Sequence, residues 1–307
     1  MLIAGFQIRA SFPQQTKGID QVISNRWPKL PLAAHLALKL KMFRRDWRDR
    51  RLLQRADVVI VSFPKSGRTW IRVMLSKVCH LSSNTGSDAV LEFDNLQKLD
   101  ASLPIIHFTH AGDAMRTPEE ITEVSKSLYP GKKIVVLVRH PADIAVSRFH
   151  HLKYRSTDPA RKQLAARPLG EFVWTDQGGI PSIVKYLNVW TSFASNNTNA
   201  IVVRYEDFSS APETALSRMA THIGIHATAA HIREAIADAS FDKMKKAEIS
   251  GQFANSRLKP RQQNDERTQK VRRGKAGGWR DSFSPTEIEK IQHYISANLD
   301  PQLGYRE

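Results

Sequence analysis

The chain has few of the features that would place it outside the cytoplasm. Its 307 residues include one cysteine, Cys79, which excludes an internal disulfide and argues against a cysteine-based metal site. No stretch approaches the roughly 20 apolar residues that a membrane-spanning helix needs. The opening MLIAGFQIRASF lacks the basic start and sustained apolar core of a signal peptide. These absences predict a cytoplasmic protein.

Acidic residues are also scarce compared with basic ones. Lys and Arg number 46 against 30 Asp and Glu, which gives a net charge of +16. Such an excess favours anionic partners, namely nucleic acid, anionic lipid or a highly charged small anion. The sequence contains no recognised nucleic-acid module and no aromatic residues interleaved with the basic clusters, so we expect no nucleic-acid partner.

Residues 1–55 form a basic N-terminal segment. Apolar residues recur at helical spacing from Leu32 to Trp47, and eight Lys and Arg residues lie between Lys39 and Arg55. This pattern predicts an amphipathic helix. Its apolar face either packs on its own domain or makes peripheral contact with the inner face of a membrane through residues 31–55.

From residue 56 onward, strand and helix patterns alternate. Short apolar runs at 57–63, 104–110, 132–139 and 199–208 predict strands, and helical patterns lie between and after them. This order predicts a single α/β domain over 56–307, with a central, mostly parallel sheet flanked by helices on both faces. The polar, basic stretch at about 251–278 is too long for an ordinary connection, so it is either a lid loop or disordered.

The stretch FPKSGRTW joins the first strand to a helix. A helix N-terminus presents free backbone N–H groups, and Lys65, Ser66, Arg68 and Thr69 add further donors. The turn is therefore a P-loop-like anion site. A nucleotide-binding P-loop has its lysine after the last glycine, whereas Lys65 precedes Gly67. A magnesium-dependent phosphotransferase, with Asp207 as a metal ligand, remains the alternative.

Two further segments carry groups suited to a second phosphate. In RHPADIAVS, Arg139 ends a strand and Ser147 lies in the next helix, at the edge where open α/β sheets bind ligands. Arg139 could instead pair with Asp143. In VRRGKAGGW, residues 271–279, two arginines precede a glycine, which lets side chains and backbone approach one anion.

Together the three segments resemble the PAPS-dependent sulfotransferases, which use 3′-phosphoadenosine-5′-phosphosulfate as sulfuryl donor and require no metal. FPKSGRTW is similar to the family's 5′-phosphosulfate loop, RHPADIAVS to its 3′-phosphate motif, and RRGKAGGW to its C-terminal signature. The motifs occur in the family's order and the resemblance spans most of the chain. It implies transfer of a sulfuryl group from PAPS to a hydroxyl, less readily an amine, of an acceptor.

The resemblance also implies roles for individual residues. Lys65, His110 and Ser147 would be catalytic, with Lys65 stabilising the departing phosphate and His110 acting as the base; His107 is the other candidate base in PIIHFTHAG. The residues implied to bind the donor are Lys65, Ser66, Gly67, Arg68, Thr69, Trp70, Arg139, Ser147, Tyr205, Phe241, Arg272, Arg273 and Gly274.

Three positions depart from the family pattern. Arg68 replaces a threonine of the loop, Phe108 stands where the family often has lysine, and Gly278 replaces an aspartate. The family's dimer motif matches this chain too loosely to predict an oligomeric state. The acceptor is expected to be a small molecule, lipid or glycan, and the guessed lining residues are Phe149, His150, Val173 and Trp174.

Overall fold

The computed structural model describes residues 36, 40, 47–84, 86–87, 89–112, 115–251, 266–271 and 274–305. The chain divides into two compact units, Met1–Gln54 and Arg55–Glu307. In the first unit the described residues 36, 40 and 47–54 are helical, and the side chains of Leu36, Leu40 and Trp47 are exposed. The remainder of the predicted amphipathic helix, and with it the question of membrane contact, lies outside the described residues.

The second unit is built on a four-stranded sheet. Its strands are β1 (Val58–Ser62), β2 (Ile106–Thr109), β3 (Lys133–Val138) and β4 (Ala200–Arg204), in the order β2-β1-β3-β4. All three pairings are parallel. The strands fall within the four predicted apolar runs, and the predicted α/β class is confirmed.

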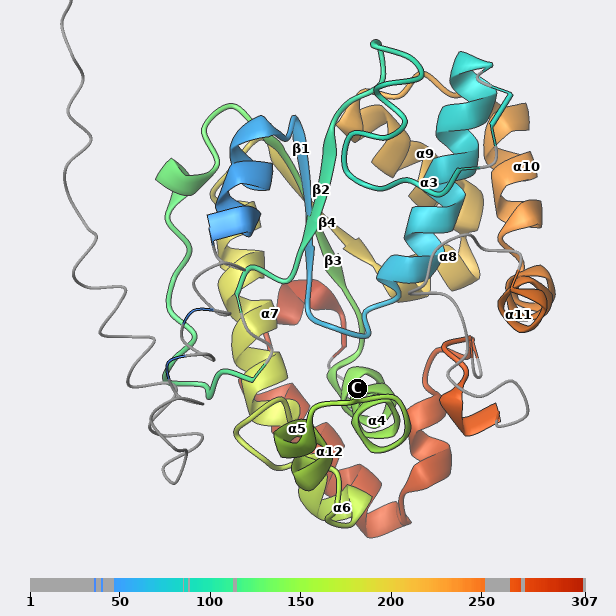
Figure 1. Ribbon diagram of the computed structural model, residues 1–307. Coiled ribbons are helices and arrows are strands. Elements are labelled where there is room, and N and C mark those ends of the chain that lie inside the picture. Colours follow the sequence, from blue (N-terminus) through green and yellow to red (C-terminus); the bar gives the residue numbers. More distant parts are fainter. Residues whose placement is uncertain are drawn as a thin grey trace, which may run out of the picture. The chain divides into compact units, whose positions relative to one another are not determined.

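Helices cover both faces of this sheet (Figure 1). On one face, α3 (Arg68–Ser83), α9 (Pro212–Ile223) and α10 (Ala229–Asp238) pack on alternate residues of β1 and β3 in one apolar cluster. The other face is covered by α7 (Ile180–Ser195), whose apolar residues are almost fully buried. Because both faces are covered, the strands are continuous apolar runs rather than alternating ones.

The remaining helices lie around the edge where the strands end. They are α4 (Pro141–Tyr154), α5 (Pro159–Leu164), α6 (Leu169–Phe172), α8 (Tyr205–Ser210), α11 (Phe241–Ser250) and α12 (Pro285–Asn298). Short 3-10 turns occupy Lys126–Leu128, Glu266–Thr268, Gly278–Ser282 and Pro301–Leu303. At the start of α12, Ser284 and Glu287 form a capping box.

One predicted strand ends earlier than its apolar pattern suggested. The run 199–208 was expected to be extended throughout, but β4 stops at Arg204 and α8 begins at Tyr205. Two acidic residues, Glu206 and Asp207, lie in the first turn of α8, where they suit the positive end of a helix dipole. The change of direction leaves Tyr205 at the carboxyl end of the sheet. No helix among the described residues is long and apolar enough to cross a bilayer.

Candidate active site

The turn between β1 and α3 is held by its own residues. Ser66 is fully buried, its hydroxyl donates to the Phe63 carbonyl at 2.9 Å, and its N–H donates to the same oxygen at 3.3 Å. Gly67 has φ +89°, and a Cβ placed there would lie 2.3 Å from Cδ2 of Tyr205. Glycine is therefore required by both backbone and packing. The Ser66 side chain closes the turn rather than facing the ligand cavity.

His110 follows β2 and approaches this turn. Its Nδ1 lies 2.7 Å from the Ser62 carbonyl and its Nε2 lies 2.7 Å from a guanidinium nitrogen of Arg68. A carbonyl only accepts and a guanidinium only donates, so the imidazole carries its proton on Nδ1 and presents a lone pair on Nε2. This is the tautomer that a general base requires. His107, by contrast, is buried on β2 against the ring of Phe93, 6.1 Å between centroids.

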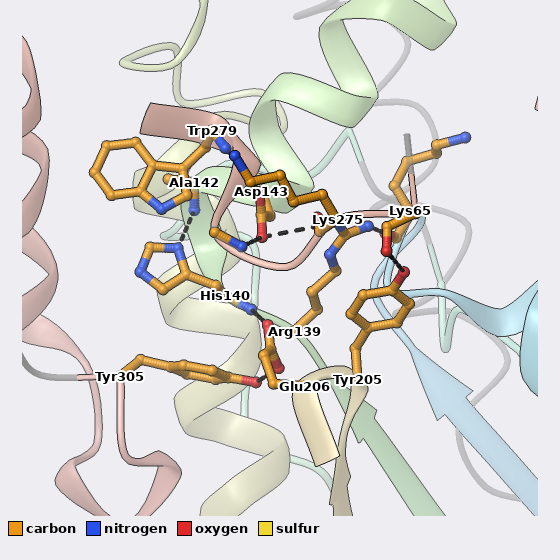
Figure 2. Close-up of polar contacts among 12 residues, drawn as sticks. Lys65, Arg139, His140, Ala142, Asp143, Tyr205, Glu206, Lys275, Trp279 and Tyr305 are labelled. Atoms are coloured by element: carbon orange, nitrogen blue, oxygen red, sulfur yellow. Dashed lines mark hydrogen bonds and ion pairs between the residues drawn. The ribbon is translucent and has the colours of Figure 1, made fainter. Parts of the chain in front are cut away.

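Arg139, at the end of β3, bonds both to the turn between β1 and α3 and to the C-terminal segment near Lys275. Its guanidinium donates to the carbonyls of Lys65 and Lys275, each at 3.3 Å, and its Cζ lies 4.2 Å from the ring centroid of Tyr205. Figure 2 shows it between Tyr205 and Asp143, with which it also pairs at 3.7 Å. The Asp143 pairing considered from sequence is thus present, and Arg139 lines the ligand cavity as well.

Asp143 holds the C-terminal segment in place. Its carboxylate is 4% exposed and accepts the N–H of Gly277 at 2.8 Å and that of Trp279 at 3.0 Å. The neighbouring His140 caps α4 and stacks on the buried Trp279 ring at 5.3 Å. Burial, followed by the charges of Arg280, Arg139 and Arg204, lowers the pKa of His140 to about 3, so the ring is neutral. Although Gly278 replaces the aspartate of the family pattern, the backbone N–H groups on either side of it, those of Gly277 and Trp279, are hydrogen-bonded to Asp143.

A second buried carboxylate anchors the other end of the same segment. Glu248 of α11 is 1% exposed, and its two oxygens accept the N–H of Lys270 at 2.6 Å and of Val271 at 2.7 Å. Arg155 pairs with Glu248 at 3.6 Å and also donates to the Thr268 carbonyl. One buried carboxylate therefore anchors Lys270 and Val271, and another anchors Gly277 and Trp279. Sequence reasoning missed both, although Asp143 stands within the RHPAD motif.

Aromatic side chains line the space between these loops. The Trp70 indole donates to the Ala239 carbonyl at 2.7 Å and packs edge-on against Tyr205 at 5.4 Å. Phe241 lies against Gly274, where an added Cβ would be 2.4 Å from the phenyl ring. Rings presented in this way suit a flat apolar group such as a nucleobase.

The elements together enclose a cavity of about 370 Å³. The residues predicted from sequence that line it are Lys65, Gly67, Arg68, Thr69, Trp70, His110, Arg139, Ser147, Tyr205, Phe241 and Gly274. Arg272 and Arg273 lie outside the described residues. The lining also includes charged and titratable residues that sequence reasoning did not single out, namely Arg72, Arg148, His151, Lys270 and Lys275.

The guessed acceptor-lining residues are not brought to this cavity. Val173 is fully buried, and Trp174 packs edge-on against Tyr294 at a separate hollow on α12. Asp207, the possible magnesium ligand, pairs with Arg204 at 4.0 Å and does not line the cavity. Among the described lining residues Asp143 is the one carboxylate, and its oxygens are engaged by backbone N–H groups.

The comparisons with known proteins agree with this geometry. Residues 55–301 match the family model described as the sulfotransferase domain. Cytosolic sulfotransferase 15 of Arabidopsis thaliana is 24% identical over 81% of this chain and 72% of the relative. Flavonol 3-sulfotransferase of Flaveria bidentis is 26% identical, covering 79% of this chain and 81% of the relative.

A solved structure shares the fold. Mouse sulfotransferase SULT7A1, complexed with PAP, aligns with a TM-score of 0.55 and 20% identity over 80% of this chain and 84% of its own. The family model covers well over half of the residues and spans the β1 turn, the end of β3 and the anchored C-terminal segment. The chain therefore belongs to the sulfotransferase domain family.

Proposed function

We propose that this sulfotransferase moves a sulfuryl group from PAPS to a hydroxyl of a small-molecule acceptor. The observation that carries the proposal is the convergence of segments 63–70, 139–147 and 270–279 on one cavity rich in hydrogen-bond donors and cations. Such a lining suits a ligand with a phosphosulfate at one end and a phosphate at the other.

The donor's parts match the lining in chemical character. The N–H groups at the start of α3 and the side chains of Lys65, Arg68 and Thr69 would bind the 5′-phosphosulfate, and the rings of Trp70, Tyr205 and Phe241 would hold the adenine. Arg139 would bind the 3′-phosphate, since its buried Nε makes no hydrogen bond to the described residues. The other groups proposed for this phosphate are Ser147, Arg272, Arg273 and Gly274.

Sulfuryl transfer requires stabilisation of the negative charge that develops on the departing phosphate, and removal of the proton from the attacking acceptor hydroxyl. As the acceptor oxygen bonds to sulfur, the bridging S–O bond breaks and its electron pair stays on the departing phosphate, beside Lys65. The lone pair on His110 Nε2 would take the acceptor's proton. Arg68 occupies that lone pair at 2.7 Å, so we expect the acceptor hydroxyl to replace it as Arg68 turns to the phosphosulfate.

The acceptor class follows from the same chemistry. One relative is named for a flavonol, which carries hydroxyl groups on flat rings. A hydroxyl of such a molecule could meet the His110 base, and we extend that class of acceptor to this chain. We keep the magnesium-dependent phosphotransferase out of the proposal, because the family match and the donor set both favour sulfuryl transfer.

Thermal unfolding with 3′,5′-ADP, the desulfated product, against ATP plus magnesium tests the donor. A ligand at a hundred times its Kd stabilises the fold by about 2.7 kcal/mol. We expect 3′,5′-ADP to raise the Tm of the wild type and Arg139→Gln to abolish most of that shift. Arg233→Gln is the matched control, because Arg233 is exposed on α10 and pairs only weakly with Glu213 at 3.9 Å.

A Tm shift with ATP and magnesium alone would overturn the proposal in favour of phosphoryl transfer. Radiolabelled PAPS and a panel of hydroxylated acceptors then test the chemistry. We expect His110→Gln to lower kcat by a factor on the order of 10² or more, without loss of 3′,5′-ADP binding.

A further inference from the structure

The ends of β3 and β4 lie side by side, and each is followed by a residue of the donor cavity. The strands are parallel neighbours, and Val138 pairs with Arg204 at the last position of their register. The next residues, Arg139 and Tyr205, line the cavity, and the Arg139 Cζ lies 4.2 Å from the Tyr205 ring centroid. The separation of the two strand ends therefore sets the spacing of the groups that we propose to hold the 3′-phosphate and the adenine.

Glu206 bridges the two ends just beyond the sheet. It follows Tyr205 in the first turn of α8, and its Oε1 accepts the backbone N–H of His140, the residue after Arg139, at 3.0 Å. Its Oε2 accepts the hydroxyl of Tyr305. Figure 2 shows the carboxylate between these two donors. Glu206 and Tyr305 lie outside the cavity lining, so the bridge can act on the donor only through the residues that it holds.

Packing fixes the ring of Tyr305 for this contact. The residue is 4% exposed, and its ring meets the His140 ring edge-on, with 5.5 Å between centroids. The Arg204 guanidinium lies over the Tyr305 ring, with its Cζ 4.5 Å from the centroid. The His140 ring in turn stacks on Trp279. Because the ring is held by these contacts, phenylalanine at 305 should keep the packing and remove only the hydrogen bond to Glu206.

The side-chain contacts of Arg139 are individually weak. Its bonds to the carbonyls of Lys65 and Lys275 are both 3.3 Å, which is longer than the roughly 2.9–3.0 Å typical of N–H···O bonds, and its pair with Asp143 is 3.7 Å. Its buried Nε makes no hydrogen bond to the described residues. The position of this guanidinium therefore depends strongly on its backbone, and the amide of the very next residue is the one that the bridge holds.

We infer that Tyr305 and Glu206 are positioning residues for the 3′-phosphate of the donor. By tying the amide of His140 to α8, they set Arg139 against Tyr205 at the spacing that the 3′-phosphate and the adenine need together. The inference rests on the proposed function. It assigns a role in donor affinity to two residues that the donor itself would not touch.

The contribution of the 3′-phosphate can be measured by itself. 3′,5′-ADP and 5′-AMP share the adenosine and the 5′-phosphate, so the ratio of the Kd of 5′-AMP to that of 3′,5′-ADP reports the 3′-phosphate alone. By calorimetry we expect Tyr305→Phe to lower this ratio fivefold or more and to change the Kd of 5′-AMP by less than twofold. Tyr294→Phe is the matched control, because Tyr294 packs on Trp174 outside the cavity; it should change neither value.

Glu206 offers a conservative variant and a disruptive one. In Glu206→Gln the amide oxygen can accept the His140 N–H while the amide NH2 donates to the Tyr305 oxygen, so the bridge is kept without its charge. We expect its ratio to stay within twofold of the wild type. Glu206→Ala removes both bonds and should lower the ratio at least as far as Tyr305→Phe does. Adding Tyr305→Phe to Glu206→Ala should lower it no further, since both changes break the same bridge.

These variants separate positioning from a purely structural role, which would lower the Tm and leave the ratio unchanged. An unchanged ratio in Tyr305→Phe, or equal weakening of 3′,5′-ADP and 5′-AMP, would overturn the inference. So would a Glu206→Gln variant as impaired as Glu206→Ala. The comparison of the two Glu206 variants tests the bridge independently of any loss of stability at Tyr305.

The outcomes also separate this inference from the proposed function. Wild-type protein that binds 3′,5′-ADP no more tightly than 5′-AMP would refute the 3′-phosphate site, and with it the proposed donor. A wild-type preference for 3′,5′-ADP that Tyr305→Phe leaves intact would refute only the positioning role of Tyr305 and Glu206.

Discussion

The two segments that we propose to bind the donor's phosphates are held in place by different contacts. The β1 turn, residues 63–67, closes on itself through bonds from Ser66 to the Phe63 carbonyl, three residues away. In the C-terminal segment, Lys270 and Val271 are held by Glu248, and Gly277 and Trp279 by Asp143, which is 134 residues from Gly277 in the chain. One loop is a local structure, and the other is placed by tertiary contacts.

The difference affects how each segment should respond to change. The hydrogen bonds of the β1 turn are local, so they do not depend on a distant anchor. The turn is instead sensitive to added side-chain volume at Gly67, which lies against the Tyr205 ring. A segment held by buried carboxylates depends on each anchor, because losing one leaves backbone N–H groups and a cation without their partner. Arg139 joins the two, bonding to Lys65 on one side and Lys275 on the other (Figure 2).

Removing the Asp143 anchor should have the largest effect. Asp143→Ala takes the acceptor from Gly277 and Trp279 and leaves Arg139 without its buried partner. Breaking a buried pair in this way costs about 3–5 kcal/mol. We expect the free energy of unfolding in urea to fall by that amount and 3′,5′-ADP affinity to fall with it.

Asp281→Ala is the matched control, because Asp281 is an exposed carboxylate of the same region that pairs with Lys275 at 3.2 Å. It should change stability by less than about 1 kcal/mol. If both variants lost the same stability, the segment would not depend on its buried anchor.

The β1 turn should fail for a steric reason. Gly67→Ala combines backbone strain at φ +89° with a Cβ 2.3 Å from Tyr205, which together should cost about 2–4 kcal/mol. We expect a lower Tm and loss of the 3′,5′-ADP shift.

Gly131→Ala isolates the backbone contribution, since Gly131 has φ +66° and nothing within 4 Å of its Cβ position. Its cost should be about 1 kcal/mol, because alanine also restricts the unfolded chain. Equal costs at the two glycines would mean that the contact with Tyr205 contributes nothing.

Weakening the second anchor should have the smallest effect of the three. Glu248→Gln keeps one acceptor oxygen but turns an amide NH2 toward a backbone donor, and Arg155 loses a charged partner while keeping its bond to the Thr268 carbonyl, at a cost of about 1–3 kcal/mol. Amide hydrogen exchange by NMR should then accelerate at Lys270 and Val271 and remain slow at Gly277 and Trp279.

The control is Glu287→Gln at the exposed capping box of α12, where glutamine accepts the Ser284 N–H as well as glutamate does. Its exchange rates and Tm should not change. Faster exchange at all four segment amides in Glu248→Gln would mean that the two anchors act as one unit.

Much of this architecture could be predicted from the sequence because it is locally encoded. Four apolar runs separated by helical patterns predicted the parallel sheet, and one eight-residue stretch predicted the anion-binding turn. The predictions of individual site residues were less accurate, because the contacts of a side chain depend on residues that are distant in the sequence. Trp174, a guessed acceptor-lining residue, packs on Tyr294 outside the donor cavity. Ser66 was expected in the phosphate cradle and instead closes the turn.

The sequence by itself determined the chemical groups of this protein and the elements that carry them. Strand and helix formation depend on short-range periodicity, and a phosphate loop needs only a few consecutive residues. The tertiary structure decided that His110 would present its lone pair, that Asp143 and Glu248 would anchor a distant segment, and that Lys270 would join Lys65 in one cavity. Those contacts arise only when packed helices bring separate segments together, so no local pattern records them.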